Sequence, residues 1–125
     1  MKEVIILEIC LRNYAHLGDA VWELYVRETL IHLCQNPQSL HRMTTEHVMA
    51  SFQVKIIDMI NSELSEEEQD LKRRARNLDV PVARRNNQNE YRLATALEVL
   101  FGYWYLNDKE RLKYFCEKLL PEIRS

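Results

Sequence analysis

The sequence is poor in residues that interrupt helices. Its 125 residues include two glycines and three prolines. So few helix-breaking residues, together with abundant Leu, Glu, Arg and Ala, predict an all-α fold. The length suits a single domain over residues 1–125 that is large enough to bury one hydrophobic core.

Cysteines and long hydrophobic runs are also scarce. The three cysteines, Cys10, Cys34 and Cys116, are odd in number, far apart and without a CxxC motif. This pattern argues against a disulfide framework or a zinc site, and it predicts buried thiols in a reducing compartment. No apolar run approaches the length of a membrane span, and the N-terminal segment lacks the small-residue cleavage site of a secretory signal. We therefore expect a cytoplasmic protein without a membrane partner.

The formal net charge of −2 conceals two segments of opposite sign. Residues 63–70 hold five acids and no base, whereas residues 72–92 hold seven bases and two acids. Bases near a helix C-terminus can simply stabilise the helix dipole, but this does not account for Arg84 and Arg85, which lie in a loop with no local acidic partner except Asp79. The basic segment is therefore a candidate site for nucleic-acid phosphates, through Lys72, Arg73, Arg74, Arg76, Arg84, Arg85 and Arg92.

Helical periodicity organises most of the chain. Ser65 and Glu68 form a capping box at one helix start, and Asp108 is a good N-cap for the last helix. Pro81 and two adjacent asparagines mark residues 78–90 as an ordered or half-ordered loop. Short connections predict that neighbouring helices pack nearly antiparallel. The expected helices cover residues 14–33, 39–61, 65–77, 90–106 and 108 onward.

Glu98 lies in the segment "LATALEVLFGYWYL", residues 93–106, which is apolar nearly all round and therefore predicts a buried helix. Apart from the tyrosines and Trp104, its only polar side chains are Thr95 and Glu98. An ionised carboxylate there would cost several kcal/mol unless it is paired or protonated. Glu98 is therefore either the partner of an internal arginine or a metal ligand.

Asp19 raises a similar question in "YAHLGDAVWELYV", residues 14–26. It falls at the boundary of an apolar arc and directly follows a helix-weakening glycine. Asp19 is either the N-cap of a helix that starts after Gly18 or a functional residue inside a longer helix. The apolar arc supports the second interpretation because it continues upstream of Gly18, through Tyr14, Leu17, Gly18, Val21, Trp22, Leu24 and Tyr25.

The two acids have parallel surroundings. Gly18 precedes Asp19, and Gly102 lies one helical turn after Glu98. This parallel predicts that the two helices cross closely at their glycines and that the acids converge. Such a pair of carboxylates would suit Mg²⁺, which takes one or two protein carboxylates and keeps several waters.

These motifs resemble a known family. "HLGDAVWELYVR" (16–27) is similar to the signature helix of ribonuclease III, and "YRLATALEVLFGYWYL" (91–106) is similar to its second acidic helix. The ordered set resembles most the short Mini-III subgroup, which lacks a double-stranded-RNA-binding domain. The resemblance implies a ribonuclease III endonuclease-domain-like helical bundle.

The resemblance also implies a function. The chain would be a metal-dependent endoribonuclease that cuts double-stranded RNA as a homodimer, in the maturation of precursor large-subunit (23S) ribosomal RNA, with a ribosomal protein as a further partner. Asp19 and Glu98 would be the catalytic, metal-binding acids, with Mg²⁺ as cofactor and Mn²⁺ as a substitute. Two further acids of long-form ribonuclease III are replaced here by Ala15 and Thr95.

Other residues receive supporting roles. Glu23 and Thr95 are predicted to orient waters around the metal, whereas His16 is interpreted as a solvated or interface residue. The aromatic cluster is interpreted as core or dimer interface, and it comprises Tyr103, Trp104 and Tyr105, with Trp22. RNA binding is assigned to Lys72, Arg73, Arg74, Arg76, Asn77, Arg84, Arg85 and Arg92.

Three rival interpretations belong to other classes. A non-catalytic helical protein that binds structured RNA or the ribosome would keep the basic segment but would not need two acids on buried helices. A nucleotide pyrophosphohydrolase would need acids at three- and four-residue spacing, whereas Glu66, Glu67 and Glu68 are consecutive. A plain helical adaptor would use Asp19 as a cap and Glu98 in a salt bridge.

Overall fold

Helices form nearly all of the part of the chain that the structure describes, which confirms the all-α prediction. The computed structural model describes the backbone of residues 2–124 and the side chains of residues 11–124. No helix in this part is both long and apolar enough to cross a bilayer. The elements are α1 (Lys2–Leu30), α2 (Pro37–Val48), α3 (Ala50–Ile60), the 3-10 turn η1 (Asn61–Glu63), α4 (Glu66–Arg76), the 3-10 turn η2 (Val82–Asn87), α5 (Gln88–Asn107) and α6 (Lys109–Arg124).

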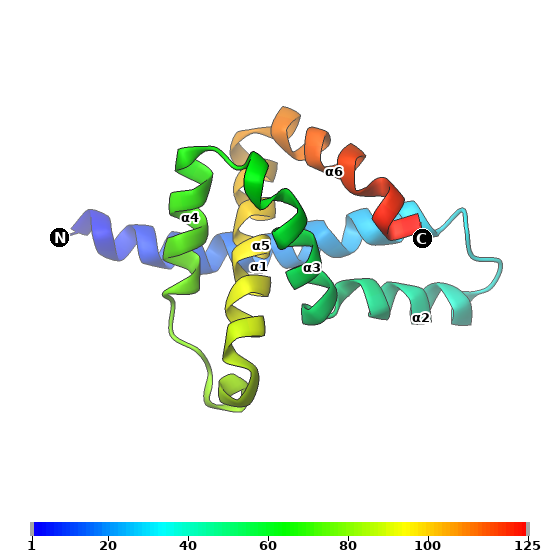
Figure 1. The fold of residues 1–125 in the computed structure, drawn as a ribbon, viewed down its shortest axis with the longest axis horizontal. Coiled ribbons are helices and arrows are strands. Elements are labelled where there is room, and N and C mark those ends of the chain that lie inside the picture. The colour runs from blue at the N-terminus through cyan, green and yellow to red at the C-terminus, as the bar shows by residue number, and fades with distance from the viewer. Residues whose placement is uncertain (1, 125) are drawn as a thin grey trace.

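Two helices, α1 and α5, form the centre of the fold. Figure 1 shows α1 along the long axis of the molecule, with α4 and α5 side by side across it and α2 running back beside α1. The nearly antiparallel packing predicted for neighbouring helices holds for α1 and α2, whereas the central pair α1 and α5, which are not neighbours in the chain, cross. The helix α5 is buried on most of its surface, as its apolar sequence predicts, and Phe101 and Trp104 are fully buried.

The core face of α1 differs from the predicted arc. Trp22, Val26 and Leu30, at four-residue spacing, are fully buried, whereas Leu24 is 56% exposed. The indole of Trp22 donates a hydrogen bond from Nε1 to the carbonyl oxygen of His47 at 3.0 Å, which joins α1 to the end of α2. Leu24 belongs to the predicted apolar arc but is exposed, because the buried face of α1 is the one that packs against α5.

The single helix predicted over residues 39–61 is two helices. Met49 between them has an extended backbone, with φ −65° and ψ 148°, and the amide nitrogen of Phe52 donates to its carbonyl oxygen at 3.1 Å. Neither glycine nor proline occurs at this break, so local sequence gave no sign of it. The change of direction lets α3 pack against α5.

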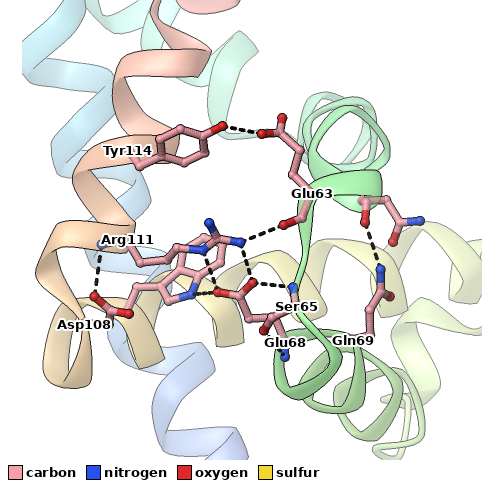
Figure 2. Close-up of polar contacts among 9 residues, drawn as sticks. Glu63, Ser65, Glu68, Gln69, Asp108, Arg111 and Tyr114 are labelled. Atoms are coloured by element: carbon pink, nitrogen blue, oxygen red, sulfur yellow. Dashed lines mark hydrogen bonds and ion pairs between the residues drawn. The ribbon is translucent and has the colours of Figure 1, made fainter.

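The capping box at the start of α4 is confirmed, and it is part of a larger network (Figure 2). The Glu68 carboxylate accepts hydrogen bonds from the backbone nitrogen of Ser65 at 2.8 Å and from Trp104 Nε1 at 2.7 Å. Arg111 of α6 donates to both Glu68 oxygens, at 2.9 and 2.8 Å. Burial alone would raise the Glu68 pKa, but these hydrogen bonds outweigh it and hold the pKa below its ordinary value. One carboxylate thus ties α4 to α5 and α6.

The other boundaries agree with the predictions in part. The helix α4 ends at Arg76, with Asn77 as its C-cap, and Asp108 accepts a hydrogen bond from the Arg111 amide at 3.1 Å, as an N-cap does. The predicted loop 78–90 contains the turn η2, and α5 begins within it at Gln88. Cys34 and Cys116 are free thiols that are partly rather than fully buried, and the side chain of Cys10 lies outside the described residues.

Candidate active site

The candidate site is built on a close contact between two glycines. A Cβ atom added to Gly18 would lie 1.6 Å from the carbonyl oxygen of Glu98, and one added to Gly102 would lie 2.1 Å from the carbonyl oxygen of Tyr14. No side chain fits at either position because the obstructing atoms belong to the backbone. The predicted close crossing of the two helices at their glycines is confirmed.

The crossing brings Asp19 and Glu98 together. Asp19 lies inside α1, many residues from either end, so the interpretation of Asp19 as an N-cap is wrong. Burial, together with the negative charge of Asp19 and a hydrogen bond to it, raises the pKa of Glu98 to about 8. The predicted convergence of the two acids is therefore confirmed.

The alternative of an internal salt bridge for Glu98 is not observed. Among the side chains of residues 11–124, no lysine, arginine or histidine forms an ion pair with Glu98. The half-buried carboxylate faces another acid instead. A pair of acids without a protein cation is stable only when one is protonated or when an external cation is shared.

A pocket of about 260 Å³ opens at the acid pair. Thr95, predicted from the sequence, lines it, and so does His16. Glu23 does not line it, and its carboxylate pairs with Arg27 at 2.8 Å. The complete lining is Arg12, Ala15, His16, Asp19, Leu78, Tyr91, Thr95 and Glu98.

Two polar residues of this pocket, Arg12 and Tyr91, were missed as site residues. Each lies seven residues, or about two helical turns, before one of the acids, and therefore on the same helix face. This spacing is the sequence signal from which both residues could have been predicted to lie at the site. Gln53 was also missed; its side-chain amide acts against Asp19 and lowers the pKa of Glu98.

The residues present fit a hard divalent cation. Within the described side chains no group of three or more His, Cys, Asp or Glu residues could hold a metal, so the donor set is the Asp19 and Glu98 carboxylates. Mg²⁺ is compatible with this set because it binds through one or two carboxylates and retains waters. The pocket leaves space for those waters and for a phosphate group.

A second pocket, of about 360 Å³, is basic. It contains five of the residues predicted to bind RNA. The Arg92 side chain donates a hydrogen bond to the carbonyl oxygen of Arg76, and this bond joins the end of α4 to the start of α5. Burial and the nearby charge of Arg76 lower the pKa of Lys72. The lining is Gln69, Lys72, Arg73, Arg76, Asn77 and Arg92.

The remaining predicted RNA-binding residues lie outside this basic pocket. Arg74 pairs with Asp70 at 2.9 Å, while Arg84 and Arg85 are exposed on η2. The basic pocket and the acid pocket adjoin. Asn77 lines the basic pocket and the next residue, Leu78, lines the acid pocket. In the same way, Arg92 lines the basic pocket and the preceding residue, Tyr91, lines the acid pocket.

Comparison with known proteins agrees with this architecture. Residues 12–109 match the Ribonuclease III domain. A crystal structure of a Fusobacterium nucleatum protein superposes with a TM-score of 0.76 at 32% identity, covering 87% of this chain and 89% of that one. The chain belongs to the ribonuclease III family, whose members are endoribonucleases.

Within the family, the curated relatives are Mini-ribonuclease 3 proteins. The chain is 44% identical over 112 residues to Mini-ribonuclease 3 of Gloeobacter violaceus, covering 90% of this chain and 83% of the relative. It is 40% identical over 114 residues to Mini-ribonuclease 3 of Enterococcus faecalis, covering 87% and 86%. These similarities confirm the resemblance to the Mini-III subgroup.

Proposed function

We propose that this chain is a Mg²⁺-dependent endoribonuclease that hydrolyses phosphodiesters in double-stranded RNA, with Mn²⁺ as a substitute metal. The observation that carries the proposal is the convergence of Asp19 and Glu98 at a helix crossing, without a protein cation among the described side chains. Two facing acids, one of them half-buried, destabilise the fold unless they serve a ligand. A divalent cation is the ligand that suits it.

Asp19 and Glu98 would hold the metal. When bound, Mg²⁺ supplies charge neutralisation at the phosphate and lowers the pKa of the attacking water. Asp19 is exposed at the pocket mouth, whereas Glu98 is half-buried, so Asp19 presents its carboxylate to substrate and solvent while Glu98 anchors the site. Thr95 and Arg12 line the same pocket, where a hydroxyl can orient water and a guanidinium can bind a phosphate oxygen.

The basic pocket would bind the RNA backbone. Lys72, Arg73, Arg76 and Arg92 line it, and arginine contacts to phosphate give affinity without sequence preference. Because this pocket adjoins the acid pocket, a strand held by the bases would pass the two carboxylates. Arg84 and Arg85 on η2 would extend the same contact along the duplex.

A homodimer would place one site on each strand of a duplex, because the strands are related by two-fold symmetry. An exposed apolar surface at the C-terminal end of α1 supports this part of the proposal: Leu24 in α1 and Ile31, directly after the helix, are 56% and 55% exposed. The family resemblance supports precursor 23S ribosomal RNA as the substrate, a ribosomal protein as a partner and the cytoplasm as the location.

Cleavage of long double-stranded RNA in the presence of Mg²⁺ tests the proposal. We expect the wild-type chain to cut, and Asp19→Asn and Glu98→Gln to lose cutting while keeping their fold and RNA binding. Glu110→Gln, at an exposed acid in α6, is the matched control and should cut normally. RNA binding without cutting by the wild type would instead indicate the non-catalytic RNA-binding alternative.

A further inference from the structure

We propose that Asn61 is a positioning residue that holds the Lys72 ammonium in the basic pocket for contact with an RNA phosphate. This inference rests on the proposed function, because it concerns how the basic pocket binds the RNA backbone. Asn61 directly follows α3 and begins the turn η1. It does not itself line the basic pocket, so it acts through Lys72.

Two side chains of the basic pocket are bonded to Asn61. Lys72 Nζ donates a hydrogen bond to Asn61 Oδ1 at 2.6 Å, and Gln69 Nε2 donates to the Asn61 carbonyl oxygen at 2.8 Å (Figure 2). Gln69 and Lys72 are three residues apart in α4, so they are neighbours on one face of this helix. The start of η1 thus holds the part of the pocket wall that these two side chains form.

The bond to Asn61 leaves Lys72 able to bind a phosphate. An ammonium group has three N–H donors, and the Asn61 amide oxygen accepts from one of them. The amide is neutral, so it offsets none of the positive charge of Lys72. Arg73 and Arg74 differ in this respect, because both pair with the Asp70 carboxylate. Lys72 is therefore held in place without an ion pair to a carboxylate among the described residues.

Holding Lys72 in place favours RNA binding by lowering its entropic cost. Lysine carries its charge on a flexible four-carbon stem, and immobilising such a side chain at an interface costs binding free energy. A lysine that is already hydrogen-bonded has lost part of this freedom before the RNA arrives. An aspartate at position 61 would also hold the ammonium, but its negative charge would oppose the phosphate.

Filter binding of long double-stranded RNA tests this role, without divalent metal so that the RNA stays intact. Asn61→Ala should bind RNA about 2–10-fold more weakly than wild type, with an unchanged salt dependence because Lys72 keeps its charge. Lys72→Met should instead lower the slope of log affinity against log salt by about 0.9. Ser62→Ala, at the exposed next residue of η1, is the matched control and should bind RNA as wild type does.

The double variant distinguishes positioning of Lys72 from general support of the fold. If Asn61 acts through Lys72, adding Asn61→Ala to Lys72→Met should not change RNA affinity further. An equal loss of affinity with and without Lys72 would overturn the inference, and so would wild-type affinity in Asn61→Ala.

The same measurements separate this inference from the proposed function. If Lys72→Met binds RNA with the affinity and salt dependence of wild type, Lys72 contacts no phosphate and the role of Asn61 is wrong, while cutting by the wild-type chain would still support the acid pocket. If the wild-type chain neither binds nor cuts double-stranded RNA, the proposed function itself is wrong.

Discussion

Gly18 and Gly102 lie backbone against backbone at the crossing of α1 and α5. A Cβ atom on Gly18 would lie 2.9 Å from the amide nitrogen of Gly102, and one on Gly102 would lie 3.1 Å from the amide nitrogen of Gly18. The nearer carbonyl oxygens of Glu98 and Tyr14 exclude a side chain at either position. This contact sets how closely the helices carrying Asp19 and Glu98 approach.

Gly18→Ala should therefore destabilise the protein, although alanine is the better helix former. The new methyl group would collide with the Glu98 carbonyl, and overpacking of this kind costs about 3 kcal/mol or more. Ala20→Gly, at an exposed position two residues away, is the control and should lose only about 1 kcal/mol through helix propensity. Urea unfolding measures both. A Gly18→Ala variant as stable as wild type would show that the helices are further apart.

Glu98 should make the metal-free protein less stable as the pH rises. Its pKa is about 8 in the folded protein against an ordinary 4.5, so the folded state binds the proton more tightly than the unfolded state. The resulting stability is fully present below 4.5 and is lost as the pH rises through about 8. The Glu98→Gln variant should not lose this stability as the pH rises.

Melting curves without metal measure the effect. Relative to wild type, Glu98→Gln should gain roughly 15 °C in melting temperature between about pH 5 and pH 9. The comparison between the two proteins removes the contributions of other titrating groups. A difference that stays constant over this range would mean that Glu98 is not held protonated by its surroundings.

Arg111→Ala should be strongly destabilising because it leaves the Glu68 carboxylate buried without its cation. Arg111 contacts both oxygens of Glu68, whose side chain is 8% exposed. Loss of one partner from a buried pair costs about 3–5 kcal/mol. Asp70→Asn, which removes an exposed pair with Arg73 and Arg74, is the control and should change stability little. If Arg111→Ala and Asp70→Asn lowered the free energy of unfolding in urea equally, this would contradict a structural role for Glu68.

The pair Arg84→Ala and Arg85→Ala should weaken RNA binding and reduce its dependence on salt. Each lost phosphate contact lowers the slope of log affinity against log salt by about 0.9, so the double variant should lower it by about 2. Lys55→Ala, at an exposed lysine paired with Glu122, serves as the control. Filter binding of a catalytically inactive chain over a range of salt concentrations decides whether η2 contacts RNA.

Much of the site could be predicted because its signals are local. A glycine close to an acid is unusual within an apolar helix, and this occurs at Gly18 with Asp19 and at Gly102 with Glu98. Such a pattern can be recognised in the sequence without knowing which helix packs against it. Residues missed at the site had weaker local signals. Arg12 and Tyr91 are ordinary surface residues by sequence, and they matter because each is two turns from an acid.

By itself the sequence determined that the chain is helical, where α4 and α6 begin, and that two glycine-flanked acids would meet. These properties follow from propensity, capping and periodicity, which act over a few residues. Only the tertiary structure decided the break at Met49, the exposure of Leu24 and the placement of Gln53 against Glu98. Each depends on which helix lies opposite, and contacts between residues distant in the chain leave no periodic mark on either segment.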